Sequence, residues 1–114
     1  MTLVQGAAEP PGVRRRILVA EDDEDILESL VGILGEAGYS VVRCRNGLEA
    51  LERLREAPVD LIVLDLMMPV MDGWEFRAAQ RKDRAIAGIP VIVITADGSA
   101  KAAATQGDLQ SQIG

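Results

Sequence analysis

The sequence contains no histidine and only one cysteine, Cys44, among its 114 residues. The absence of histidine excludes Ser-His-Asp catalysis and the commonest zinc sites. A single cysteine cannot form an internal disulfide, and no histidine is present to activate its thiol. We therefore expect Cys44 to pack in the fold or lie at its surface. Catalytic or binding residues are expected among the other side chains.

Basic residues are also scarce, since 12 lysines and arginines face 18 aspartates and glutamates, and the net charge is -6. This balance provides no basic surface for nucleic acid, so we predict no nucleic-acid partner. No apolar run approaches the roughly 18 residues that a transmembrane helix needs. The first 16 residues do not resemble a signal peptide, because Pro10-Pro11-Gly12 interrupts them and their charges follow the weakly apolar segment. We expect a cytoplasmic protein without a membrane partner.

The length indicates a single domain, and a hydrophobic content of 48% is typical of globular proteins. Residues 1–13 show no periodicity and contain a Pro-Pro-Gly break, so we expect a flexible leader. Residues 14–106 carry the periodic segments and are predicted to form the domain. Residues 107–114 are expected to form a polar tail.

Short apolar runs alternate with segments of helical spacing along the domain. Strands are predicted at about 15–20, 39–45, 59–64 and 90–95, and helices at about 26–37, 48–57 and 73–82. Asp23 or Asp25 is expected to cap the first helix and Gly38 to end it. A fourth helix is predicted from about Ser99 through residues 101–105. This alternation predicts an α/β fold with a doubly wound parallel sheet and helices on both faces.

Acidic residues follow two of the apolar runs directly. Glu21 and Asp22 come after residues 17–20, and Asp65 comes after residues 61–64. Ligands of open α/β sheets bind beyond the carboxyl ends of the strands, so we expect these three carboxylates to converge if the strands are neighbours. Carboxylates this close repel one another unless a cation or protons intervene. Oxygen ligands with an open side favour Mg²⁺, which we predict as the cofactor.

The chain resembles the receiver domain of bacterial two-component response regulators over about residues 15–105. Three motifs carry the resemblance: I-L-V-A-E-D-D at 17–23, D-L-M-M-P-V-M-D-G at 65–73, and I-V-I-T-A at 92–96. The second motif is highly specific to that family. The resemblance implies a flavodoxin-like fold.

The resemblance also implies a role for each matching residue. Asp65 would accept a phosphoryl group from a phosphohistidine on a sensor histidine kinase or phosphotransfer protein. Asp22 would bind Mg²⁺ directly, Glu21 directly or through water, and Met67 through its backbone carbonyl. Thr95 would donate its hydroxyl to a phosphoryl oxygen. The domain would act as a phosphoacceptor in signal transduction and not as an enzyme.

The chain departs from the family after Thr95. Family members continue with a fifth strand that ends in Lys-Pro and a fifth helix, and no such segment is recognisable here. We therefore expect a sheet truncated after the fourth β/α unit, with Lys101 as a solvated lysine of the fourth helix. The strand at 91–95 would then be an open apolar edge, which predicts a homodimer through strand four and helix four.

Other functions compete with phosphotransfer. A degenerate receiver would keep the acidic pocket and serve only as an interaction or dimerisation module, which the missing lysine favours and the intact acidic triad opposes. A metal-dependent phosphohydrolase is expected to carry a second aspartate at the position of Met67. A flavin carrier of this topology needs a hydroxyl- and Gly-rich loop in place of Glu21, Asp22 and Asp23, which would repel phosphate.

Overall fold

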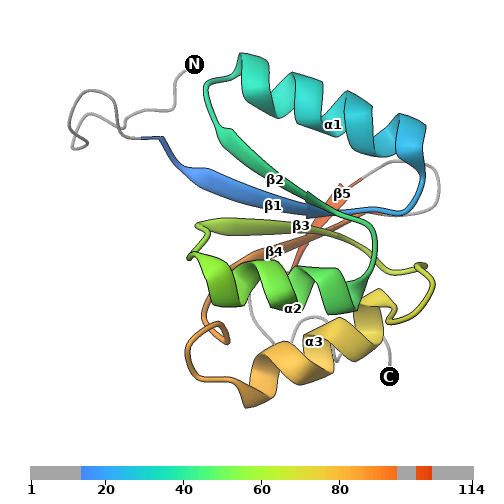
Figure 1. Cartoon of the computed structure of the whole chain (residues 1–114), viewed down its shortest axis with the longest axis vertical. Coiled ribbons are helices and arrows are strands. Elements are labelled where there is room, and N and C mark those ends of the chain that lie inside the picture. The colour runs from blue at the N-terminus through green and yellow to red at the C-terminus, as the bar shows by residue number, and fades with distance from the viewer. Residues whose placement is uncertain (1–13, 95–99, 104–114) are drawn as a thin grey trace.

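The computed structural model describes residues 14–94 and 100–103, and side chains over residues 14–94. These residues form one five-stranded sheet and three helices (Figure 1). The elements in chain order are β1 (Arg16–Ala20), α1 (Glu24–Glu36), β2 (Ser40–Cys44), α2 (Gly47–Glu56), β3 (Leu61–Asp65), α3 (Gly73–Lys82), β4 (Val91–Ile94) and β5 (Ala100–Ala103).

The strands lie in the order β2-β1-β3-β4-β5. The first four are parallel, as predicted, and β5 is antiparallel to β4. Ala20 of β1 is in register with Leu64 of β3, so the carboxyl ends of the two strands lie side by side. The residues that follow them therefore emerge at the same edge of the sheet.

Polar caps fix where the helices begin. Asp23 caps α1 and accepts hydrogen bonds from the amides of Asp25 and Ile26, at 3.0 and 3.1 Å. Asn46 caps α2, and Asp72 forms a capping box with Glu75 at the start of α3. The prediction of Asp23 as a cap is confirmed, and the third helix has its predicted bounds. Among the helices of the described part, none combines the length and apolarity that a membrane span requires.

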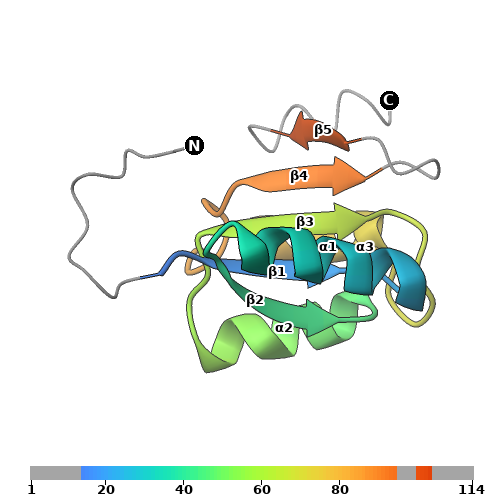
Figure 2. The same cartoon turned by 90° about the horizontal axis from the view of Figure 1, so that it is seen from above.

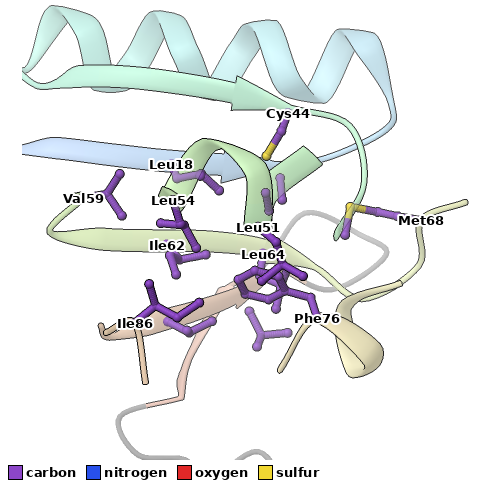
Figure 3. Packing of buried hydrophobic residues seen from close by; sticks show 14 residues of the cluster. Leu18, Cys44, Leu51, Leu54, Val59, Ile62, Leu64, Met68, Phe76 and Ile86 are labelled. Atoms are coloured by element: carbon purple, nitrogen blue, oxygen red, sulfur yellow. The ribbon is translucent and has the colours of Figure 1, made fainter. Parts of the chain in front are cut away.

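The sheet has unequal cores on its two faces. α2 and α3 cover one face and α1 the other (Figures 1 and 2). Under α2 and α3, Phe76, Leu18, Ile62 and Leu64 are fully buried, and Figure 3 shows their packing. The α1 face has a smaller cluster, which comprises Ile17, Val19, Leu27, Val63 and Ile94. Alternate residues of β1, β3 and β4 thus point to opposite cores, as a doubly wound sheet requires.

Two predictions about the end of the chain are wrong. Residues 100–103 form a strand and not a helix, and β4 is not an open edge because β5 pairs with all four of its residues. Alanine and lysine favour helices locally, and pairing with the free backbone groups of β4 overrides that preference. Lys101 accordingly lies in β5, in register with Val93, and not in a helix. Thr95 falls outside the described residues.

Candidate functional site

Three carboxylates meet where β1 and β3 end. Glu21 and Asp22 follow β1, and Asp65 is the last residue of β3. One carboxylate oxygen from each of the three lies within 4.8 Å of the other two. The convergence predicted from the sequence is confirmed, and it results from the register between β1 and β3.

The three side chains have different environments. Glu21 and Asp65 are 3% and 9% exposed, whereas Asp22 is exposed to solvent. Glu21 Oε2 accepts a hydrogen bond from the Asp23 amide at 2.9 Å, and Asp65 Oδ1 accepts one from the Met67 amide at 3.2 Å. Backbone amides therefore orient both buried carboxylates, while Asp22 lies on the solvent side of the cluster.

The buried carboxylates resist ionisation. Burial is the main cause that raises the pKa of Glu21, to about 7, and the negative charges of Asp65 and Asp22 raise it further. Burial likewise raises the pKa of Asp65, and the charge of Asp22 adds to the effect. Bound cations favour the ionised forms of such groups, so this pocket has the electrostatic character of a cation site.

The donor set fits magnesium. Mg²⁺ holds oxygen ligands at about 2.1 Å, so two of its ligands are at most about 4.2 Å apart. The separation of up to 4.8 Å between the carboxylate oxygens is close to that limit, and the exposed Asp22 side chain can shorten it. Three carboxylates on one side leave the remaining positions for water or phosphate oxygens, which Mg²⁺ commonly keeps.

The loop from Leu66 to Asp72 follows Asp65 directly and contacts its carboxylate through the Met67 amide. Val70 has a φ of 69°, and the Met71 amide donates to the Pro69 carbonyl at 2.7 Å, which together make a γ-turn. A β-branched residue is strained at positive φ. The side chain of Val70 is 75% exposed, so little side-chain burial accompanies this conformation.

Two glycines hold this loop in place. The Gly47 amide donates to the Met71 carbonyl at 2.7 Å, and the Gly73 amide donates to the Leu66 carbonyl at 3.0 Å. A Cβ atom on Gly73 would lie 2.7 Å from the Asp65 carbonyl oxygen, and one on Gly47 would lie 2.7 Å from Cγ of Met71. The sequence analysis did not identify this role, although each glycine follows a helix-capping residue, Asn46 or Asp72.

Met67 and Thr95 complete the set of predicted site residues. Met67 lies in the loop beside Asp65, with its side chain 73% exposed and its amide donating to that carboxylate. Thr95 lies beyond the described end of β4. Ile94, the residue before it, is in register with Asp65, so β4 ends beside the acidic cluster.

Comparison with known proteins agrees with this geometry. The family model of the response regulator receiver domain matches residues 17–111. The chain belongs to the response regulator receiver family. A receiver domain of Methanoculleus marisnigri has a crystal structure that superimposes with a TM-score of 0.69 at 41% identity, covering 71% of this chain and 66% of that one. The flavodoxin-like receiver fold is therefore confirmed.

Curated relatives of this receiver domain are longer proteins. Response regulator RR06 of Streptococcus pneumoniae is 44% identical over 84 residues, which cover 72% of this chain and 36% of the relative. Response regulator receiver protein CpdR of Brucella abortus is 51% identical over 61 residues, which cover 54% of this chain and 51% of the relative. This receiver domain thus spans about a third to half the length of these relatives.

Proposed function

We propose that this receiver domain is a phosphoacceptor in two-component signal transduction. Asp65 takes a phosphoryl group from a phosphohistidine on a sensor histidine kinase or a phosphotransfer protein. The observation that carries the proposal is the convergence of Glu21, Asp22 and Asp65 at the carboxyl ends of β1 and β3. Membership of the receiver family supports the same role.

The chemistry requires a nucleophile and compensation for negative charge. An oxygen of Asp65 attacks phosphorus, the P–N bond to the donor imidazole breaks with its electron pair leaving on nitrogen, and an acyl phosphate forms. The Met67 amide already orients Asp65 for this step through Oδ1. Mg²⁺ held by Glu21, Asp22, Asp65 and the Met67 carbonyl would neutralise phosphoryl oxygens, and Thr95 would donate a hydrogen bond to one of them.

Labelling with a small phosphoryl donor tests the role of Asp65. The Asp65→Asn variant should lose all Mg²⁺-dependent labelling. Asp72→Asn is a matched control, because it makes the same chemical change at the far end of the loop that follows Asp65, and asparagine keeps the helix cap. Strong labelling of Asp65→Asn contradicts the assignment. Failure of the wild-type chain to label while it binds Mg²⁺ indicates the degenerate interaction module instead.

Magnesium binding is tested separately. Trp74 is half-buried near the start of α3, close behind the loop that follows Asp65, so its fluorescence should report Mg²⁺ addition. We expect saturable binding that Asp22→Ala weakens at least tenfold, since one ligand is lost without disturbing a buried side chain. An unchanged Mg²⁺ affinity in Asp22→Ala would rule out a magnesium site formed by Glu21, Asp22 and Asp65.

The proposal extends to the bounds of the domain, its location and its partners. We propose that residues 14–106 form the domain and that it works in the cytoplasm, without nucleic acid, membrane or enzymatic activity of its own. We also propose a homodimer through β4, whose edge is paired with β5 in the structure. A dimer of this kind requires that β5 leave β4.

A further inference from the structure

β5 differs in composition from every other strand of the sheet. Its sequence is Ala-Lys-Ala-Ala, whereas β4 beside it is Val-Ile-Val-Ile. Alanine and lysine are depleted in strands and rank among the best helix formers, while valine and isoleucine are enriched in strands. The strand state of residues 100–103 therefore depends on pairing with β4 and not on local preference.

The two strands are also held differently. β4 pairs with β3 on its other side, and Val91, Val93 and Ile94 are 2–4% exposed. β5 is the last strand in the sheet order, so its only strand partner in the described part of the chain is β4. Opening the pair between β4 and β5 would thus free one edge of β4 while β4 stays in the sheet.

We propose that β5 is a displaceable cover and that β4 of a second copy of this chain takes its place. The edge of β4 already accepts a four-residue antiparallel strand, in the register from Val91 with Ala103 to Ile94 with Ala100. Two β4 strands can pair antiparallel across a two-fold axis, because such an interface uses the same surface of both copies. The single new strand pair joins β-branched residues of both copies and replaces two pairs with an alanine-rich strand, one from each copy.

While β5 is paired with β4, no other chain can pair with this edge, so we expect a monomer at low protein concentration. β5 belongs to the same chain, so its effective concentration at β4 is high, on the order of millimolar for a short connection. A second copy competes only when protein concentration or a weakened β5 favours it. The proposal rests on the homodimer suggested above and on no step of phosphoryl transfer.

Locking β5 onto β4 tests the proposal. Ile92→Cys with Ala102→Cys, and Val93→Cys with Lys101→Cys, place cysteines at directly opposed positions. Both pairs are made, because adjacent antiparallel pairs alternate in Cα separation and the closer one suits a disulfide. In sedimentation velocity we expect the oxidised protein to be monomeric. The same protein with reductant is the matched control and should match the concentration-dependent dimer of the wild-type chain.

Weakening β5 should act in the opposite direction. Lys101→Pro and Ala102→Pro are both made, because hydrogen-bonded pairs alternate along the ladder and only one of the two prolines removes a donor to β4. We expect that variant, here taken as Ala102→Pro, to lower the dimer dissociation constant at least tenfold. An oxidised lock that dimerises like wild type overturns the proposal, as does a folded Ala102→Pro that stays monomeric with unchanged hydrogen exchange in β4. Phosphoryl labelling of Asp65 in the locked monomer is measured alongside, so failure of the phosphoacceptor role is recognised independently.

Discussion

The two halves of the sheet are stabilised in different ways. In the half formed by β1 and β3, the strands are apolar, parallel and buried, and they position the acidic cluster. In the half formed by β4 and β5, an apolar strand pairs with an alanine-rich strand at the edge. Packing holds the first half, whereas the second depends at its outer side on backbone pairing. The comparison predicts that the edge pair of β4 and β5 opens more easily than the strands that position the acidic cluster.

The largest expected effect is the difference in lost stability between Leu64→Ala in β3 and Ala102→Gly in β5. Leu64 of β3 is fully buried, so its truncation should lower the free energy of unfolding by about 3 kcal/mol through lost burial and a cavity. Ala102→Gly in β5 should cost about 1 kcal/mol or less, chiefly through backbone entropy. Urea denaturation of both variants measures the contrast. Similar losses in the two halves would show that β5 is as firmly held as β3.

The second effect is a loss of stability with rising pH, and we expect it from the acidic cluster beside β1 and β3. Because the folded pKa of Glu21 is raised from 4.5 to about 7, the native state keeps a proton that the unfolded state loses in this interval. Stability from this group is therefore full below about pH 4.5 and is lost as the pH rises through 7, with roughly 2–3 kcal/mol of the loss between about pH 5 and about pH 8. Urea denaturation with a chelator, at about pH 5 and about pH 8, should show the loss.

Glu21→Gln is the control for this pH dependence. Glutamine can still accept from the Asp23 amide but does not ionise, so the variant should lack this part of the slope. Added Mg²⁺ should restore stability to the wild-type protein at the higher pH, because the cation favours ionised carboxylates. Equal slopes in wild type and Glu21→Gln would show that Glu21 is not the group responsible.

A smaller effect concerns strain beside the acidic cluster. Val70→Asn should raise the free energy of unfolding by about 1 kcal/mol, because asparagine tolerates positive φ better than valine does. The exposed Val70 side chain leaves little burial to lose. Thermal unfolding measures the gain, with Val31→Asn as a contrasting change on α1, where φ is helical and a loss is expected. A destabilised Val70→Asn would mean that the loop does not store this strain.

The smallest expected effect is a stabilisation of the edge pair formed by β4 and β5. Ala102→Val gives β5 a residue that favours strands and should stabilise the pair with β4 by about 0.5 kcal/mol. Hydrogen exchange of the β4 amides is the sensitive measurement, since slower exchange reports a tighter cover. Ala57→Val, at the C-cap of α2 and away from this edge, serves as the control and should leave exchange in β4 unchanged.

Sequence patterns predicted the first half of the sheet better than the second. Apolar runs followed by carboxylates identified β1, β3 and the acidic cluster, because burial and strand ends both leave local patterns. The segment at 100–103 was mistaken for a helix, since alanine and lysine report local preference and its pairing partner lies several residues earlier in the chain. The strained turn at Val70 also could not be predicted, because valine normally argues against positive φ.

Cys44 gives this protein a built-in chemical reporter. Its thiol lies at the end of β2, 2% exposed, with Sγ 3.5 Å from the Val19 carbonyl oxygen, and burial raises its pKa to about 12. A thiol reagent can reach it only when β2 and its surroundings open, and the reactive thiolate forms only in that open state. Because the sequence has no other cysteine, the rate of modification measures how often that edge opens, without any introduced label.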